Sequence, residues 1–423
     1  MIVRLAILLI VILILVGVGF FVFHLMGSVE PKKRKECKKH RVRSRTPSPE
    51  RQLPNTCTPC GPNKVLICDR TLNQTLCVDF CSALDKIGTG AAICGPCPVI
   101  PPPPAFPNMV VTDYLSNTLA VFATTATGNV APLRTISGPL TTLVSPNNAI
   151  GDNKNNEIVV VNTTGGPINL GSLTVFSNTA NGNVAPLRTI TGGTNTELST
   201  PQGLAVDTVN NEYLVANLGL FNKGVRGYVT VYSRTANGDV APLRSFWSSV
   251  DLPGTFIAGA GFGTVYTVDV NTTADEIYLG GSGDPGFVAT FSRTASGAVA
   301  PLRVIAGSNA NLGFVAGVQL DATPDELFVL RPDPVNGSSI LVFPRTASGN
   351  VAPSRAIHGP ATMLLFPDGR MTIDSTNITV TDFLTPQVLT FVKTASGNVA
   401  PIRIISGGST MLDGAFAVTP LNA

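Results

Sequence analysis

Cysteines are the first residues in this 423-residue chain whose type and spacing could do chemistry. Seven of the eight lie within about forty residues, namely Cys57, Cys60, Cys68, Cys77, Cys81, Cys94 and Cys97. The C-x-x-C pairs at the two ends of this stretch have the spacing of a four-thiolate zinc site. The three cysteines between them, and the lack of histidine there, favour a disulfide framework instead. Residues 57–97 are therefore predicted to form a small module stabilised by disulfides, with zinc as the alternative.

The rest of the chain offers little that could carry catalysis. Residues 108–423 contain no cysteine and a single histidine, His358. A His/Cys metal site is therefore excluded there, and a Ser-His-acid triad would depend on that one side chain. His358 follows a predicted strand and reads as a loop residue, and no nucleophile elbow or phosphate-binding glycine loop occurs. The sequence thus favours a non-enzymatic protein with no cofactor in this region.

A repeated motif must position whatever this region presents. Six near copies of Phe291-Ser-Arg-Thr-Ala-Ser-Gly-Ala-Val-Ala-Pro-Leu-Arg303 recur at intervals of 48 to 59 residues. A fixed motif with variable spacers indicates one supersecondary unit copied several times. Each copy ends in an arginine that is expected to pair with an acid of a neighbouring turn, such as Glu212, Glu276 or Glu326. These six arginines are Arg134, Arg188, Arg244, Arg303, Arg355 and Arg403.

Each repeat contains the patterns of four short strands. Residues 173–176, 229–232 and 288–291 show β-branched enrichment and period-two alternation, and residues 204–207 and 213–217 read as two further strands upstream of the motif. Thr-Ala-x-Gly then predicts a hairpin turn, and Val-Ala-Pro-Leu-Arg-x-Ile predicts an outer strand. Its proline cannot donate to a ladder, so that strand is expected at an exposed sheet edge. The acids that end the first strand are expected to accept hydrogen bonds from turn amides. They are Asp207, Asp269, Asp321 and Asp374.

Repeated four-stranded antiparallel units of this length predict a β-propeller. The first copy opens at Asn108-Met-Val-Val-Thr-Asp113 and lacks an innermost strand. The chain ends with Ala415-Phe-Ala-Val-Thr419, a strand pattern with no blade of its own. Placing this strand in the first blade gives six complete blades over residues 108–423 and closes the ring.

The Ala-Val-Asp strand, polar turn and Tyr-Leu-Val-Ala-Asn strand at residues 205–217 resemble those of NHL-repeat and lactonase-like propellers. The resemblance covers Asn108–Ala423, and for the lactonase-like members it implies a divalent metal held by Glu, Asn and Asp. The residues that close the second strands are expected near one mouth of the central channel, as ligands of a cation or small polar molecule or simply as strand caps. They are Asp113, Asn162, Asn217, Gly281, Arg331 and Asp382. The glutamate of the metal set has no counterpart among them.

The N-terminal region reads as a membrane attachment. Leu5–Phe23 carries no charge, and as a helix it would span roughly 28 Å, so residues 1–27 are predicted to form an uncleaved signal-anchor. The basic segment at residues 28–56 is predicted to contact anionic lipid, with a nucleic-acid-binding arm or a nuclear localisation signal as alternatives. Its first cations are Lys32, Lys33, Arg34 and Lys35. The proline-rich residues 98–107 are predicted to form a stiff spacer.

Charge and compartment signals differ between the two parts of the chain. Residues 1–107 carry 14 basic and 6 acidic side chains, whereas residues 108–423 carry 15 and 20, so the propeller is not expected to bind nucleic acid. The cysteines favour an extracytoplasmic or virion-surface location. So do five glycosylation sequons, at Asn73, Asn162, Asn271, Asn336 and Asn377. The basic residues that follow the anchor favour the cytosol instead.

The sequence therefore predicts a membrane-anchored propeller that displays a surface for a protein or glycan partner. The loop from Leu218 to Gly227 interrupts the repeat and carries three apolar side chains, Leu218, Leu220 and Phe221, which are the predicted partner surface. The alternative function is that of a lactonase-like hydrolase with a metal at the channel mouth.

Overall fold

The computed structural model describes residues 107–422, apart from 166–169, 192–194, 220–226, 253–263 and 283–285, together with four short strands before them. The chain divides into two compact units, Met1–Val99 and Ile100–Ala423. The predicted anchor and basic segment lie outside the described residues. Among the residues that are described, no helix combines the length and the apolar character that crossing a membrane requires.

The first unit contains a small antiparallel sheet within the cysteine-rich segment. Its strands are β1 (Pro59–Gly61), β2 (Lys64–Asp69), β3 (Gln74–Asp79) and β4 (Ala92–Cys94). In the register, Cys77 lies opposite Leu66, and Cys94 lies opposite Ile67. Cys57, Cys81 and Cys97 lie outside the described residues, as does the spacer up to residue 106.

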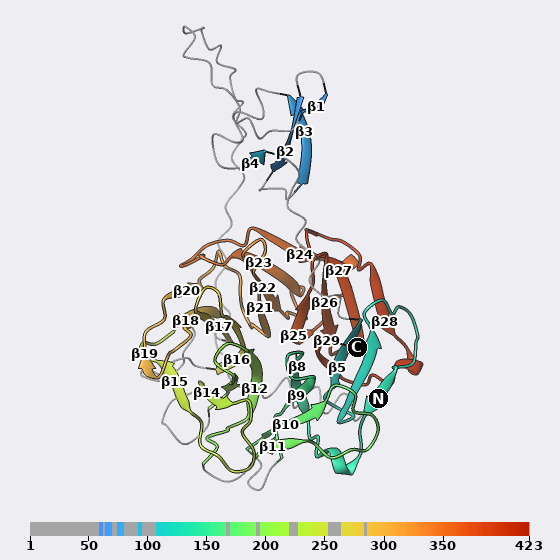
Figure 1. The fold of residues 1–423 in the computed structure, drawn as a ribbon, viewed down its shortest axis with the longest axis vertical. Helices are drawn as coiled ribbons and strands as arrows, with labels where there is room; N and C mark the ends of the chain where they lie inside the picture. Colours follow the sequence, from blue (N-terminus) through green and yellow to red (C-terminus); the bar gives the residue numbers. More distant parts are fainter. Residues whose placement is uncertain are drawn as a thin grey trace, which may run out of the picture. The chain divides into compact units, whose positions relative to one another are not determined.

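The second unit is an all-β ring of six sheets around a central axis (Figure 1). Each sheet, or blade, has four antiparallel strands, which are arranged in order from the axis to the rim. The innermost strands of blades 1 to 6 are β29 (Ala415–Leu421), β8 (Pro146–Asp152), β12 (Pro201–Asp207), β16 (Thr264–Asn271), β21 (Gly317–Asp321) and β25 (Pro367–Ile373). The second strands are β5 (Asn108–Asp113), β9 (Glu157–Asn162), β13 (Glu212–Asn217), β17 (Glu276–Ser282), β22 (Glu326–Arg331) and β26 (Asn377–Asp382).

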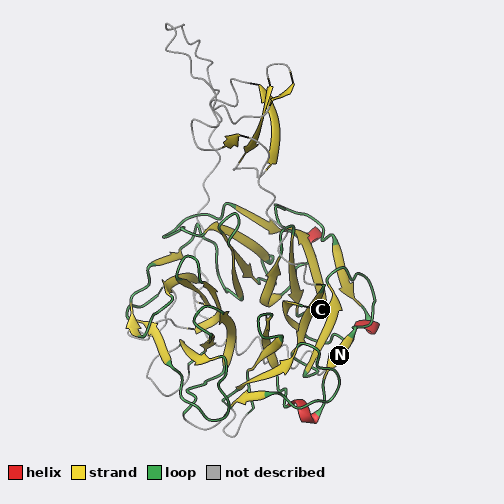
Figure 2. Ribbon diagram, viewed as in Figure 1, coloured by secondary structure: helices red, strands yellow, loops and turns green. Residues whose placement is uncertain are grey.

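The outer half of each blade is built from the repeated motif. The third strands are β6 (Thr118–Ala123), β10 (Ser172–Ser177), β14 (Tyr228–Ser233), β18 (Phe287–Ser292), β23 (Ser339–Pro344) and β27 (Gln387–Val392). The outer strands are β7 (Arg134–Ile136), β11 (Arg188–Ile190), β15 (Arg244–Ser248), β20 (Arg303–Ala306), β24 (Arg355–His358) and β28 (Arg403–Ser406). The described helical segments are single 3-10 turns after outer strands, at η1 (Pro139–Thr141), η2 (Pro360–Thr362) and η3 (Gly408–Thr410) (Figure 2).

The two ends of the ring meet as the sequence predicts. Strand β29 pairs antiparallel with β5, and the register runs from Ala415 opposite Asp113 to Leu421 opposite Asn108. The C-terminal strand is therefore the innermost strand of the blade that opens the propeller. This pairing confirms the prediction of six blades and leaves no open end in the ring.

The core lies between neighbouring blades, because both faces of every blade are covered. One buried cluster joins Leu214 and Val229 of blade 3 to Val268, Leu279 and others of blade 4. Such strands are apolar on both faces, which explains runs such as Ile158–Val161 that do not alternate with polar residues.

The outer strands differ from the prediction. They begin at the motif arginine, so the preceding Val-Ala-Pro-Leu belongs to the connection and its proline is not in a strand. That connection also covers the edge of the preceding blade: the Gly182 amide of blade 2 donates to the carbonyl of Thr135 in blade 1 at 2.6 Å. Parallel pairs of this kind join all six blades, at Gly128–Ile405, Gly182–Ile136, Gly238–Ile190, Gly297–Phe246, Gly349–Ile305 and Gly397–Ile357. In blade 4 the connection forms the short strand β19 (Gly297–Val299).

Motif glycine and arginine each have an inter-blade role. The six glycines have φ between 70° and 81°, where a side chain would be strained, although a Cβ there would meet no atom within 4 Å. Arg244 makes a two-pronged ion pair with Glu212 at 2.6 and 2.9 Å and also donates to the Arg293 carbonyl of the next blade. Arg188, Arg303 and Arg355 also form ion pairs, with Glu157, Glu276 and Glu326, as predicted. Arg134 differs from the prediction, because within the described residues it donates to the backbone carbonyls of Asn178 and Ala180 instead of an acid. The motif therefore fastens each blade to its neighbour.

Candidate binding site at one end of the channel

The innermost strands begin with an irregularity at the channel wall. In blades 1 to 4 one residue near the start of the innermost strand, the second in blades 1 to 3 and the third in blade 4, is skipped in the register with the second strand, which makes a β-bulge. The skipped residues are Phe416, Asn147, Gln202 and Tyr266. Asn147 donates to the side chain of Gln202 at 2.6 Å, so bulge residues of adjacent blades meet. A bulge redirects side chains and is common beside binding sites.

Aromatic rings gather at this end of the blades. Phe416 lies 5.5 Å from Tyr114 and 5.9 Å from Phe383, and Tyr114 and Phe383 directly follow second strands. Phe314 lies 4.6 Å from Tyr266 in an edge-to-face contact and 6.5 Å from Phe366 in a stacked one. The two groups join where the Phe383 amide donates to the Phe366 carbonyl at 3.0 Å.

We call these six residues the aromatic arc. It runs through blades 4, 5, 6 and 1, and every one of its members is partly exposed. Buried aromatic rings would need no further explanation, but a cluster left partly open to solvent at the end of a channel is typical of a recognition surface.

Asp368 is the second residue of β25, two positions after Phe366 of the aromatic arc. The residue is 8% exposed, and the one hydrogen bond of its side chain within the described part of the chain comes from the Gly369 amide at 2.7 Å. The Thr381 hydroxyl lies within hydrogen-bonding distance of the carbonyls of both Asp368 and Phe416, at 3.1 and 2.8 Å. Burial raises the pKa of the Asp368 carboxyl to about 8, and the charge of Asp382 adds to the effect.

Deeper in the channel, Arg370 reaches from blade 6 to the opposite wall. Its guanidinium lies 3.4 Å from a carboxylate oxygen of Asp269 in blade 4 and 3.4 Å from the carbonyl of Leu204 in blade 3. Blade 6 permits this because three residues, Gly369 to Met371, stand between the paired residues Asp368 and Thr372, a wider bulge than in the other blades. Burial raises the pKa of Asp269 despite this partner.

Asp269 does not have its predicted role. It accepts a hydrogen bond from the Leu320 amide of blade 5 at 2.9 Å rather than from turn amides. The reason is that β16 continues to Asn271, whose side chain accepts the amides of Thr273 and Ala274 in its place. The other three acids do accept turn amides as predicted: Asp207 from Val209 and Asn210, Asp321 from Thr323, and Asp374 from Thr376 and Asn377.

The residues predicted at the channel mouth sit at the same end as the aromatic arc, where second strands end, but they bind within their own blades. Asp382 accepts the amides of Leu365, Phe366 and Thr385. Asn162, Asn217 and Asp113 are fully buried, and each accepts hydrogen bonds from backbone amides of the loop that precedes an innermost strand. Asn162 accepts the amide of Val144, and Asn217 accepts that of Ser199. Asp113 accepts the amides of Asp413 and Gly414. Arg331 pairs with Asp333 at 2.6 Å, and Gly281 offers no side chain.

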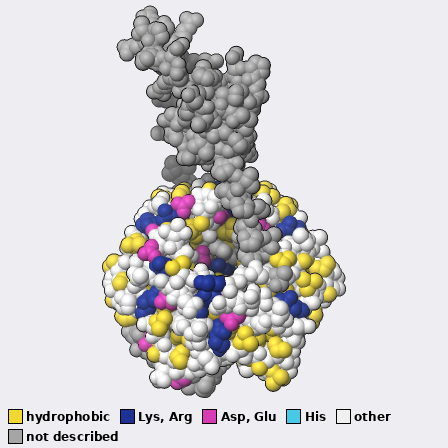
Figure 3. All heavy atoms as spheres, viewed as in Figure 1, with side chains coloured by type: hydrophobic (Ala, Val, Ile, Leu, Met, Phe, Trp, Pro, Cys, Tyr) yellow, Lys and Arg dark blue, Asp and Glu magenta, His cyan; other side chains and the backbone are white. Residues whose placement is uncertain are grey.

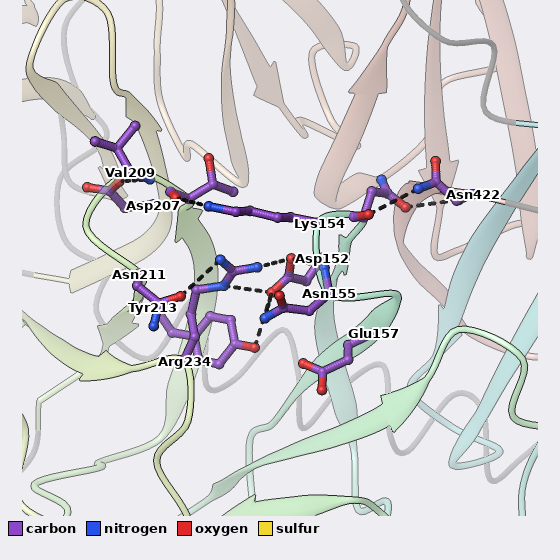
Figure 4. A network of polar contacts seen from close by, with 12 residues as sticks. Asp152, Lys154, Asn155, Glu157, Asp207, Val209, Asn211, Tyr213, Arg234 and Asn422 are labelled. Carbon is purple, nitrogen blue, oxygen red and sulfur yellow. Dashed lines mark hydrogen bonds and ion pairs between the residues drawn. The ribbon is translucent and has the colours of Figure 1, made fainter.

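The opposite ends of the innermost strands are held by charged contacts between blades (Figure 4). Arg234 of blade 3 forms an ion pair with Asp152 of blade 2 through two guanidinium nitrogens, and both side chains are fully buried. Asn211 and Tyr213 complete this network. Arg293–Asp207 and Lys393–Asp321 repeat the arrangement between later blades, at 2.8 and 2.7 Å. Figure 3 shows a face hollowed at the axis, with charged side chains beside the hollow.

The predicted partner loop begins directly after β13. The Leu218 amide donates to the Thr200 carbonyl, and the Gly227 amide donates to the Leu218 carbonyl. Leu220 and Phe221 lie outside the described residues. His358 is predicted to be a loop residue after an outer strand, but it is the last residue of β24, where it is exposed.

Sequence reasoning did not find the aromatic arc, although a signal was present. Tyr114 and Phe383 directly follow Asp113 and Asp382, which the sequence did single out. The bulges at Tyr266 and Phe416, by contrast, could not be predicted from the repeated sequence motif.

Comparisons with known proteins agree with this fold. No family model matches the chain, and no curated protein matches it. A chain from the solved structure of a nidogen/laminin complex is similar at 11% identity and a TM-score of 0.50, covering 74% of this chain and 97% of that one. The periplasmic gluconolactonase of Pseudomonas aeruginosa is similar at 14% identity and a TM-score of 0.48, covering 71% of this chain and 96% of that one. A functionally unknown protein of Desulfotomaculum acetoxidans is similar at 10% identity and a TM-score of 0.45, covering 74% of this chain and 99% of that one. The chain is thus a six-bladed β-propeller protein.

Proposed function

We propose that this protein is a membrane-anchored, non-enzymatic propeller that binds a protein or glycan partner through the aromatic arc. The observation that carries the proposal is the convergence of six partly exposed rings at one end of the channel. Such rings offer large contact area at small cost in side-chain entropy and are enriched where proteins recognise partners.

Two further features support the same end of the propeller. The loop from Leu218 to Gly227, which the sequence suggests as a partner surface, begins where β13 ends, just as Tyr114 and Phe383 of the arc follow the ends of β5 and β26. Loops carried on a rigid scaffold are common sites of recognition. By contrast, the other end of the innermost strands is occupied by ion pairs such as Arg293–Asp207 that already have partners within the chain.

A lactonase-like hydrolase is the weaker candidate. Its metal would require free oxygen ligands at the channel mouth, but Asp113 and Asp382 each accept several hydrogen bonds from backbone amides. A carboxylate used in this way fixes loop geometry rather than binding an ion. In the described part of the propeller, no three His, Cys, Asp or Glu side chains are grouped as a metal site would need.

The remaining assignments are proposals from the sequence. We infer that the blades are of the NHL type from the Ala-Val-Asp and Tyr-Leu-Val-Ala-Asn strands. We also propose that Leu5–Phe23 anchors the chain, that the cations from Lys32 to Lys35 contact anionic lipid, and that the module at 57–97 is held by disulfides on an extracytoplasmic or virion surface.

A capture experiment tests the proposed function. The full-length chain is presented to a glycan array and to membrane-protein extracts, beside the variant Tyr114→Ala/Phe383→Ala. The control is Leu187→Ala/Leu243→Ala, which removes exposed apolar side chains of the rim instead. The proposal predicts bound partners that the arc variant loses and the rim variant keeps. Binding that depends on the rim leucines, or metal-dependent ester hydrolysis by the wild type, would contradict it.

A further inference from the structure

Asp368 is a buried acid that the fold does not use. The other acids of the innermost strands have ion-pair or turn-amide partners, whereas Asp368 is bound only by the amide of its neighbour Gly369 within the described residues. The nearest cation along the chain, Arg370, is engaged across the channel by Asp269. A nearly buried carboxyl without a cation is costly to ionise, which makes Asp368 a candidate ligand-binding group.

The surroundings of Asp368 define what that ligand would be. Phe366 precedes Asp368 by two residues, and the Thr381 hydroxyl lies within hydrogen-bonding distance of the backbone carbonyls of Asp368 and Phe416. Burial raises the pKa of Tyr266, two blades away, and the charge of Asp368 adds to that effect. Aromatic faces attract cations, and a carboxylate in their midst supplies the opposite charge.

We propose that the aromatic arc and Asp368 together bind an alkylammonium group, presented by a lysine side chain of the partner. This inference rests on the proposed function and specifies its ligand chemistry. The cation enters at the arc, packs its methylene groups on Phe416 and Phe366, and pairs with the carboxylate of Asp368. A neutral glycan could use the rings but would leave the carboxyl without a partner.

Binding of this kind has a pH signature. Since the Asp368 carboxyl holds its proton up to a pH of about 8, the cation must displace that proton, so affinity rises with pH until the group is ionised. A lysine ammonium keeps its own proton to about pH 10. The titratable groups on the strands that pack against β25 are Asp382 of β26, Asp321 of β21, Asp152 of β8, Asp207 of β12, and Glu326 with Arg331 of β22. The charge of Asp382 acts on Asp368, while Asp152, Asp207 and Asp321 are ion-paired at the far end of their strands.

The test uses calorimetric titration of the full-length chain with two probes. Nα-acetyl-lysine methylamide carries the ammonium, and Nα-acetyl-norleucine methylamide has the same methylenes without the charge. The expected result is binding of the lysine probe alone, with affinity about tenfold higher at pH 9 than at pH 7 and release of a proton at pH 7. Choline serves as a third probe, because tight binding of choline with weak binding of lysine would assign the site to a free quaternary ammonium compound and overturn the lysine source.

The variant Asp368→Asn preserves shape and removes the charge, and Asp374→Asn at an exposed turn is the matched control. Asp368→Asn is expected to weaken lysine binding at pH 9 at least tenfold and to abolish the pH dependence, while Asp374→Asn changes neither. Equal binding of both probes, or a wild-type affinity independent of pH, would overturn the inference even if the variant failed to fold. If arc variants lose the partner while Asp368→Asn keeps it, the proposed function stands and the ammonium site falls.

Discussion

The buried ion pair between Arg234 and Asp152 provides the sharpest test of how the blades are joined. Both side chains are 0% exposed, they belong to different blades, and the residues lie 82 positions apart in the chain. Replacing Arg234 by Met keeps most of the side-chain volume but leaves the Asp152 carboxylate buried without its cation. Breaking a buried pair in this way costs about 3–5 kcal/mol of unfolding free energy.

The assay is equilibrium unfolding in urea, followed by tryptophan fluorescence and circular dichroism. For a domain of this size, the expected loss corresponds to a melting temperature lower by roughly 5–8 °C. Asp275→Asn is the control, since Asp275 is 61% exposed in its pair with Arg293 and should change stability by less than about 1 kcal/mol.

The double variant Asp152→Asn/Arg234→Met separates the pair from the site. Without a buried charge left over, it should recover more than half of the loss seen in Arg234→Met. A single-variant loss below about 1 kcal/mol, or a double variant as unstable as the single one, would refute the view that this contact latches blade 2 to blade 3.

Three other perturbations have defined outcomes. Asp368→Asn should raise the melting temperature at pH 9 and leave it unchanged near pH 4. Between those two pH values the Asp368 carboxyl ionises freely only in the unfolded chain, so its raised pKa destabilises the folded wild type increasingly as the pH rises. A difference between variant and wild type that is the same at every pH in thermal melts would contradict this. Truncation before Ala415 removes the innermost strand of blade 1 and should abolish cooperative unfolding in calorimetry, whereas a sharp, unchanged transition would show that closure is dispensable. If the propeller faces the secretory lumen, mass spectrometry should find a glycan on exposed Asn336 and none on Asn162, whose side chain is fully buried and hydrogen-bonded; the reverse pattern would argue against this fold in the cell.

Blade number and closure were predictable because they follow from periodic features. The repeated aromatic-to-proline spacing sets the unit, and a strand pattern at Ala415–Thr419 without a blade can pair only with the blade that lacks one. The Arg–Glu pairs were predictable for the same reason, since the charges recur in register with the strands.

Features that depend on contacts between blades were not predictable. The edge expected at the outer strands is covered by the connection of the next blade, a contact that no single repeat encodes. Asp269 looked like a turn acid, yet two further residues of strand moved that role to Asn271. The aromatic arc depends on bulges that shift register by one or more residues, and a one-residue shift reverses the face on which a side chain lies.

The central claim is that the aromatic arc is where this propeller meets its partner. Hydroxyl-radical footprinting, compared between the chain in the cells that produce it and the purified full-length chain, tests this without knowledge of the partner. We expect Tyr114, Phe383 and Phe416 to be protected in the cells, while the exposed rim residues Leu187 and Leu243 react equally in both samples. Protection of the rim leucines with unchanged oxidation of the three arc residues would contradict the account.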